Sequence, residues 1–471
     1  MQNKGIAPNS VDVTIRAGHT VILDGLKNVH NLTIEQGGIL KSNGGYGTPG
    51  SQTLRVGAGA AASVVIKNNG LLGGDANPDD FITLEFTANC ASVLITGTGL
   101  TKITRLRPLY PNPNPLTVTF NQDISISYNS GGFTAYYNNA ANTNAEIVTY
   151  IINAGKTVKL THPAGSFNAT PNPTPNPGGK YTYLINGTLD LSATTATSHA
   201  VPFSNNAASV VAIQVGNAGI LKLGSGFNTV NSTPGAANGK VVLTIANGGL
   251  VDATKTSNLN LGANYFITEG AGALKRAVSA TPVLFPVGTS DISYNPVVIT
   301  NTGSVDNFSV GVKTNFDHTP AAPLQAVNRQ WSIAEEIPGE SVVDISLGWL
   351  TPAQATAFDA SKPISLMRYT GATWENTHAS LTGTGTLTDP YLATASGFTV
   401  FADLGVTNNI TSLTTNSVLT PFSQTKGNPS ASQTFTVKGS NLTDVITVTP
   451  RKPMRYPLII QIGIPLQPPW L

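Results

Sequence analysis

A short acidic stretch, GGDANPDD, carries the side chains in this sequence that are best suited to metal chemistry. Asp75, Asn77 and Asp79 offer oxygen atoms at alternate positions, which is the ligand type and spacing of a tight calcium-binding loop. The stretch departs from an EF-hand loop, because Asp80 stands where that loop needs glycine and Phe86 where it needs glutamate. Two interpretations follow, a calcium site and a solvated turn, and the departures favour the turn.

The doublet Asp79 and Asp80 is also the closest approach to a catalytic acid pair. A glycosidase needs two carboxyl groups that face each other about 5 to 9.5 Å apart. Polygalacturonase-like enzymes carry Gly-His-Gly and Arg-x-Lys phrases on neighbouring coils, and a lyase needs an Arg or Lys base beside acidic calcium ligands. Neither group of residues is found in the sequence. We therefore predict that the protein is not an enzyme, with polysaccharide-degrading activity as the alternative.

The stretch ISYNSGGFTAYYNN places Tyr128, Phe133, Tyr136 and Tyr137 among asparagines and glycines. Exposed aromatic rings of this kind can stack on the faces of sugars while nearby amides bind the hydroxyl groups. The alternative is that two of the four rings fill the interior of the fold. The hypothesis is a glycan-binding site, with glycans or other cell-surface molecules as partners.

Composition narrows the classes of partner. Charged residues make up only 11% of the chain, against roughly 25% in an average soluble protein. The net charge is +2 without a basic cluster, so binding to nucleic acid has no basis.

The single cysteine, Cys90, lies in an apolar stretch and is predicted to be buried. There is no run of 18 apolar residues, so we expect no transmembrane helix.

Any such site must be positioned by a repeat that fills the first half of the chain. Its formula is apolar, any, Ile or Val, three residues, Gly, any, Leu or Val. Four copies fit it: Leu32, Ile34, Gly38 and Leu40; Val64, Ile66, Gly70 and Leu72; Ile213, Val215, Gly219 and Leu221; Leu243, Ile245, Gly249 and Val251. Looser copies start at Val93, Val118, Tyr183 and Tyr265. The copies recur at intervals of about 30 residues, which indicates stacked repeats.

Alternation of apolar residues within each copy predicts a strand, and the glycine is expected to supply positive φ at a corner. One strand cannot bury its apolar face, but stacked coils bury a continuous column. We predict an all-β protein in which residues 1–278 form a right-handed parallel β-helix. It should have two or three strands per turn and about nine coils between residues 11 and 278. An antiparallel sandwich is the alternative for this region.

The composition changes near residue 279, where tryptophan appears for the first time. Alternating runs predict an antiparallel β-sandwich over residues 279–405, with the tryptophans as core anchors. Thr351 as N-cap and Pro352 after it predict one helical turn. Residues 406–450 are interpreted as a linker and the start of an incomplete Ig-like module.

The last segment, residues 451–471, holds five prolines and three basic residues without an acid. Each proline removes a backbone donor that a sheet would need. We interpret this segment as an aberrant tail produced by a shift of reading frame, and expect it to be disordered. Residues 406–471 are expected to be protease-sensitive and dispensable for the rest.

Several phrases resemble a known family. VTIRAGHTVILDGLKNVHNLTIEQGGILK resembles the repeats of large secreted β-helix surface proteins of Bacteroidota-type bacteria, FPVGTSDISYNPVVIT the sandwich that follows, and SQTFTVKGSNLTDVITVTP their Ig-like modules. The resemblance covers nearly the whole chain and carries no catalytic signature. It implies an extracellular or outer-surface location, a signal peptide and a C-terminal domain for type IX secretion. Neither segment is found here, so we expect a chain truncated at both ends. The predicted function is a non-enzymatic, adhesin-like structural protein.

Overall fold

The computed structural model describes residues 11–42, 52–57, 63–74, 82–87, 90–108, 115–127, 133–134, 147–165, 167–168, 179–195, 210–229, 239–408, 412–415, 433 and 437–440. The chain divides into two compact units, residues 1–408 and 409–471. Strands form almost all of the regular structure in the described residues, with two short 3-10 turns at Pro323–Gln325 and Thr351–Ala353. The predicted all-β class is confirmed.

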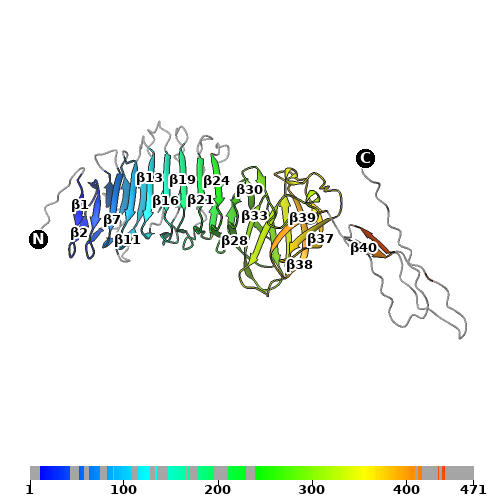
Figure 1. Cartoon of the computed structure of the whole chain (residues 1–471). Helices are drawn as coiled ribbons and strands as arrows, with labels where there is room; N and C mark the ends of the chain where they lie inside the picture. The colour runs from blue at the N-terminus through cyan, green and yellow to red at the C-terminus, as the bar shows by residue number, and fades with distance from the viewer. Residues whose placement is uncertain are drawn as a thin grey trace. The chain divides into compact units, whose positions relative to one another are not determined.

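The first unit begins with a stack of coils whose strands pair in parallel (Figure 1). The first side, sheet A, contains β1 (Val13–Ile15), β4 (Leu32–Ile34), β7 (Ser63–Asn68), β10 (Ser92–Thr96), β13 (Leu116–Asn121), β16 (Ile147–Ile152), β19 (Lys180–Ile185), β21 (Val210–Val215), β24 (Lys240–Ile245) and β27 (Phe266–Thr268), and continues into β30 (Val287–Ser290) and β31 (Ser293–Tyr294). The ten strands from β1 to β27 mark ten coils, where about nine were predicted.

Two further sides complete each turn. Sheet B contains β2 (Thr20–Leu23), β5 (Ile39–Ser42), β8 (Leu71–Gly73), β11 (Leu100–Ile103), β14 (Ile124–Ile126), β17 (Thr157–Leu160), β20 (Thr188–Asp190), β22 (Ile220–Lys222), β25 (Leu250–Asp252) and β28 (Ala273–Val278). Sheet C contains β3 (Lys27–Val29), β6 (Thr53–Val56), β9 (Thr83–Phe86), β12 (Arg105–Pro108), β15 (Phe133–Thr134) and β18 (Phe167–Asn168), and the same side of two later coils is formed by β23 (Gly226–Asn228) and β26 (Asn258–Asn260). The predicted parallel β-helix is therefore present, with three strands in most turns.

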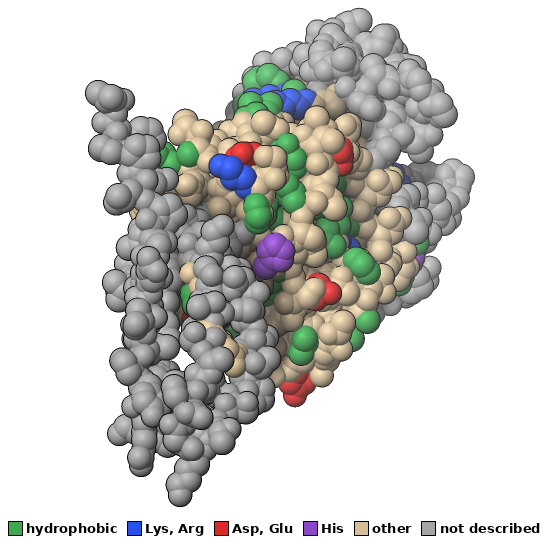
Figure 2. Space-filling model, turned by 90° about the vertical axis from the view of Figure 1, so that its right-hand side faces the viewer, with side chains coloured by type: hydrophobic (Ala, Val, Ile, Leu, Met, Phe, Trp, Pro, Cys, Tyr) green, Lys and Arg blue, Asp and Glu red, His purple; other side chains and the backbone are tan. Residues whose placement is uncertain are grey.

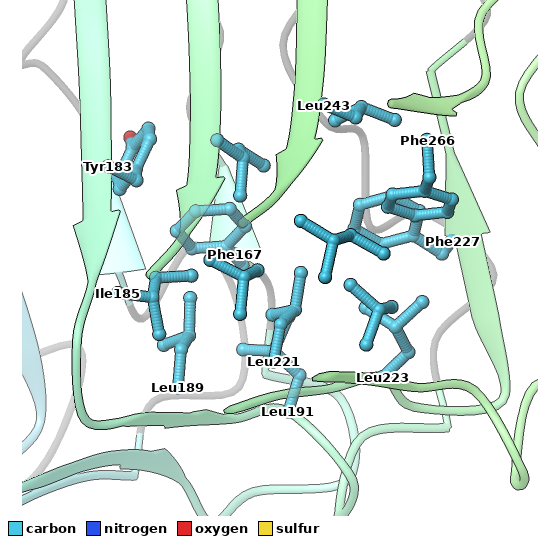
Figure 3. Packing of buried hydrophobic residues seen from close by; sticks show 14 of the residues in the cluster. Phe167, Tyr183, Ile185, Leu189, Leu191, Leu221, Leu223, Phe227, Leu243 and Phe266 are labelled. Atoms are coloured by element: carbon cyan, nitrogen blue, oxygen red, sulfur yellow. The ribbon is translucent and has the colours of Figure 1, made fainter. Parts of the chain in front are cut away.

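The interior of the coils is a continuous apolar column. Tyr183, Ile213 and Leu243 lie at one level of sheet A, and Ile185, Val215 and Ile245 lie at the next inward level. All six side chains are almost completely buried. Figure 3 shows this column between Tyr183 and Phe266, with Leu189, Leu191, Leu221 and Leu223 facing it from the opposite side. Alternation in the sequence thus fixed which side chains point inward.

The aligned glycines do not have the backbone conformation that was predicted. Positive φ occurs one residue earlier, at Gly37 (80°), Ala218 (58°) and Gly248 (78°), and not at the glycines that follow them. The prediction of positive φ is therefore confirmed for Gly248, the glycine that follows Asn247, and is wrong for the aligned glycines Gly38, Gly70, Gly219 and Gly249.

The aligned position needs glycine for a different reason, which is close contact with the preceding coil. A Cβ atom would lie 2.8 Å from the Ile15 carbonyl oxygen at Gly38, and 1.9 Å from that of Ile185 at Gly219. Gly70 stacks on Gly38 in the same way, with 2.2 Å between the built Cβ and the carbonyl oxygen below. No side chain fits at this corner, because the backbones of successive coils touch there.

The register between β4 and β7 also differs from the sequence alignment. Leu32 pairs with Ile66 and not with Val64, whereas Leu40 pairs with Leu72 as predicted. The corner after β7 is therefore two residues shorter, and Asn68 occupies the inward level that Ile34 holds in the coil below. Near the other end, Phe266 pairs with Leu243. The copy assigned to start at Tyr265 is therefore displaced by one residue.

The last coil is also the first strand of the sandwich. β28 pairs in parallel with β25 through Ala273 to Lys275, and antiparallel with β33 (Asp306–Lys313) through Leu274 to Val278. One hydrogen-bonded sheet therefore continues from the coils into the next layer, and no linker separates the two parts.

The sandwich consists of two antiparallel sheets that share β37 (Trp374–Thr382). One sheet continues from β28 and β33 through β34 (Gln330–Glu335), β39 (Asp403–Thr407) and β36 (Ile364–Tyr369), and the other contains β29 (Val283–Phe285), β32 (Val297–Asn301), β35 (Val343–Trp349) and β38 (Tyr391–Phe398). The antiparallel β-sandwich prediction is confirmed.

Two of the three tryptophans in the sandwich anchor its core. Trp331 and Trp349 are completely buried, and the Trp331 indole donates to the Asn295 carbonyl oxygen at 3.2 Å. The predicted turn is present as a 3-10 turn, but Leu350 and not Thr351 precedes it as the cap residue. β39 runs to Thr407, two residues beyond the boundary expected from the sequence, because Val406 is a buried core residue.

The second unit has one described strand pair. β40 (Ser412–Thr415) and β41 (Val437–Ser440) pair antiparallel, with Leu413 opposite Gly439. The aberrant tail of residues 451–471 lies outside the described residues.

Candidate functional site

Most residues of the two sites predicted from sequence lie outside the described part of the chain. This applies to the calcium ligands Asp75, Asn77 and Asp79, to the doublet partner Asp80, and to Tyr128, Tyr136 and Tyr137. Within the described residues, no three His, Cys, Asp or Glu side chains gather as metal ligands.

Phe133 is described, and its side chain is inside the coils. Its ring centroid lies 5.0 Å from that of Tyr150, 5.4 Å from Phe167 and 6.0 Å from Tyr183, in edge-to-face contacts. It is 1% exposed. The interpretation as an interior residue therefore holds for Phe133, because its ring is not accessible to a sugar. The edge-to-face contacts among these aromatic rings instead stabilise the interior of the coils.

The structure brings together a charged cluster that the sequence did not reveal. On the outer face of sheet C, Glu85 lies between Arg55 on the coil below and Arg107 on the coil above. Glu85 Oε2 accepts from Arg55 Nε at 2.6 Å, and Glu85 Oε1 accepts from Arg107 Nε at 2.7 Å. The Glu85 side chain is 1% exposed. These three residues are called the Arg–Glu–Arg clamp.

The clamp is better suited to a structural role than to acid–base chemistry. Both carboxylate oxygens of Glu85 are engaged by guanidinium groups, so neither is free to take a proton from a substrate. Charge-assisted hydrogen bonds to both neighbours instead hold three successive coils together. Arg55 and Glu85 are 30 residues apart in the sequence, and Glu85 and Arg107 are 22 residues apart. The repeat spacing was therefore the one signal of the clamp in the sequence.

A second set of charges lies on the outer face of sheet B. In the strand register of successive coils, Lys159 lies opposite Asp190, which lies opposite Lys222. Lys222 in turn lies opposite Asp252, and Asp252 opposite Lys275. Lys275 then forms an ion pair with Glu336 of the sandwich. The signs alternate along the whole series, which we call the charge ladder. Opposite charges that face each other across neighbouring strands favour this register over one displaced along the strands.

Asp190 is the most buried acid of the charge ladder. Burial acts to raise the pKa of its carboxyl group, but hydrogen bonds from Ser192 and the charges of Lys159 and Lys222 together outweigh burial. The pKa of Asp190 therefore lies below its ordinary value. Its Oδ1 accepts from the Ser192 amide at 2.9 Å.

The third tryptophan of the sandwich belongs to a partly exposed aromatic cluster. Trp374 is half-buried, and its indole donates to the His318 carbonyl oxygen at 2.9 Å. The His318 ring stacks on Tyr369 with centroids 3.9 Å apart, and Phe316 meets Trp374 edge to face at 5.6 Å. These contacts fasten the segment after β33 onto the β36–β37 hairpin, so the cluster is explained by packing.

The described surface carries few charges. On the face shown in Figure 2, charged side chains are scattered among uncharged polar and hydrophobic ones and form no patch. Within the described residues, no helix has the length and apolar character needed to cross a membrane.

The chain was compared with protein-family models, with curated proteins and with solved structures. None of them matches it.

Proposed function

We propose that the protein is a non-enzymatic structural protein of the adhesin type, secreted or displayed on the outer cell surface. In this role it holds a binding surface away from its attachment point on a rigid rod. The observation that carries the proposal is β28, which belongs to the coil stack and to the sandwich at once. A shared strand prevents the sandwich from swinging relative to the coils, because any hinge would break its hydrogen bonds.

The size of the coil stack suits a spacer. Each coil adds about 4.8 Å, so ten coils give a rod of about 45 Å before the sandwich begins. The apolar column is continuous over this length, and stacked repeats of this kind resist bending because each coil is bound to both neighbours. The resemblance of the repeat phrases to secreted surface proteins supports the proposed location.

Rigidity can be tested with two spin labels. Cys90 is the single cysteine and is buried, so a Cys90→Ala background leaves no reactive thiol. Labels at Thr14→Cys in the first coil and Ala372→Cys in the exposed β36–β37 turn then report one distance across the first unit. We expect one narrow distance distribution. A broad or two-peaked distribution would contradict the rod.

The non-enzymatic part of the proposal needs a separate test. The protein is incubated with neutral and acidic polysaccharides, and reducing ends and unsaturated products are measured. We expect none above background, and we expect Asp79→Ala/Asp80→Ala to keep the fold and any surface binding. Product release that disappears in this double variant, or in Glu85→Gln with the fold intact, would establish the alternative of a polysaccharide-degrading enzyme.

A further inference from the structure

The outward face of sheet A carries three parallel columns of side chains between β7 and β19. The first is a hydroxyl column, in which every coil contributes serine or threonine. Its members are Ser63, Ser92, Thr117, Thr149 and Thr182. The Ser92 hydroxyl donates to the Ser63 hydroxyl at 2.9 Å, so these two members are hydrogen-bonded to each other.

The second column lies two residues along each strand and is mainly aliphatic. Its members are Val65, Leu94, Thr119, Ile151 and Leu184. These side chains point away from the interior, and Val65 is 38% exposed while the other four are half-buried.

The third column, at the corner that follows, is polar. Asn121 Nδ2 donates to Thr96 Oγ1 at 3.3 Å, and Asn153 Nδ2 donates to Asn121 Oδ1 at 3.2 Å. An aliphatic column is therefore flanked on one side by hydroxyl groups and on the other by amides. We call this surface the strip. Within the strands β7, β10, β13, β16 and β19 as described, the lysines are Lys67 and Lys180.

We propose that the strip binds a linear, uncharged polysaccharide whose chain lies along the stack of coils. A pyranose ring has an apolar face of C–H groups and a rim of hydroxyl groups. The aliphatic column can contact the C–H faces, while the hydroxyl and amide columns can hydrogen-bond to the rims on either side. The chemistry repeats at each coil, about every 4.8 Å, which suits a polymer of repeating units better than a single small ligand.

Other classes of partner fit the strip less well. Nucleic acid and anionic membranes are bound through clustered Lys and Arg, and the strip has two separated lysines. Protein interfaces are enriched in aromatic residues, Met and Arg, none of which belongs to the strip. The charge ladder lies on a different side of the coils, sheet B, and mainly on later coils, so its charges do not belong to the strip.

The test places charges on the aliphatic column. Purified full-length protein is mixed with microcrystalline cellulose, chitin or insoluble xylan, and the bound fraction is measured by sedimentation. Leu94→Lys/Ile151→Lys should reduce the affinity for the glycan that the parent binds by at least about tenfold. Thr119→Lys, a single change at a half-buried polar position, gives a second variant if the double variant fails to fold.

The matched control is Ile220→Lys/Leu250→Lys, which changes two half-buried aliphatic residues on the outer face of sheet B. It should stay within about twofold of the parent. Failure of the parent to bind any of the three glycans, an equal loss in the control, or binding to DNA or anionic vesicles in their place would overturn the strip assignment. The inference rests on the proposed binding function. The two proposals fail in different measurements: the strip assignment fails if protein does not bind glycan, and the non-enzymatic proposal fails if glycan products are released.

Discussion

The hydroxyl of Thr268 satisfies both backbone hydrogen-bonding groups of Val312. Thr268 Oγ1 donates to the Val312 carbonyl oxygen at 2.7 Å and accepts from the Val312 amide at 2.8 Å. Thr268 is at the inward level that Ile245 occupies one coil earlier, and both Thr268 and Val312 are buried. The apolar column thus ends in a hydroxyl group that fastens β33 of the sandwich to the last coils.

Thr268→Val should weaken this junction. The substitution keeps the shape but leaves a buried N–H and a buried C=O unpaired, which should lower the free energy of unfolding by about 3 kcal/mol. Thr268→Ser keeps the hydroxyl and should cost about 1 kcal/mol through the lost methyl group. Urea denaturation of the three proteins measures both values. Equal stability of the valine variant and the parent would show that the hydrogen bonds do not hold the junction.

Ala218 is the residue other than glycine with positive φ in the described part of the chain, and this conformation is strained for alanine. Ala218→Gly should therefore raise the free energy of unfolding, by roughly 0.5 to 1 kcal/mol after the greater flexibility of glycine in the unfolded chain is counted. Gly219→Ala should do the opposite, because its Cβ would lie 1.9 Å from the Ile185 carbonyl oxygen. Thermal unfolding of the two variants checks the pair. The assignment of roles to the two positions fails if both changes shift the midpoint in the same direction.

Ile245→Asp should disrupt the apolar column. Ile245 is 0% exposed and lies between Val215 and Thr268, so the carboxylate would be buried without a partner. We expect a loss of about 4 kcal/mol or more in the free energy of unfolding. Thr244→Asp, which faces outward, should cost only about 1 kcal/mol. Denaturation midpoints that are the same for the two variants would mean that the inward and outward assignments are incorrect.

Glu85→Gln should break the Arg–Glu–Arg clamp. The variant leaves Arg55 and Arg107 facing each other without the carboxylate between them, and we expect a loss of about 3 kcal/mol. Glu375→Gln removes an exposed ion pair with Arg368 and should cost at most about 0.5 kcal/mol. The comparison is made by urea denaturation at low and high salt. A cost for Glu85→Gln as small as that of the control would argue against a structural clamp.

Asp190 should contribute to the pH dependence of stability. Its pKa is lower in the folded protein than the value of about 3.9 in an unfolded chain, so the folded state favours the ionised form. The resulting stabilisation is present above about pH 4 and is lost as the pH falls through the folded pKa. Asp190→Asn should therefore cost about 1 kcal/mol at pH 7, and progressively less below pH 4.

Denaturation at pH 7 and at low pH measures this difference. Asp389→Asn, at an exposed position, controls for the change in net charge. A difference between parent and Asp190→Asn that grows as the pH falls would have the wrong sign for a depressed pKa and would refute the role of the charge ladder.

The sequence predicted the fold class because its decisive signal is local. Alternation within VVLTI places Leu243 and Ile245 inward, and recurrence about every 30 residues requires coils that stack in parallel. Burial of Cys90 also followed from its apolar surroundings. The candidate site was predicted less well. Phe133 is a core residue, and the Arg–Glu–Arg clamp was missed because its members come from three coils.

The sequence by itself determined the inward positions of the regular copies, their recurrence at about 30 residues, and that antiparallel strands follow. Only the tertiary structure decided how one coil lies on the next. Leu32 pairs with Ile66 because the corner after β7 is short and is closed by Asn68, whose amide donates to the Leu100 carbonyl oxygen at 2.8 Å. Contacts between coils depend on the length of every corner and loop, which an alternating pattern does not specify. The clamp, the charge ladder and the strip therefore exist only once the register is set.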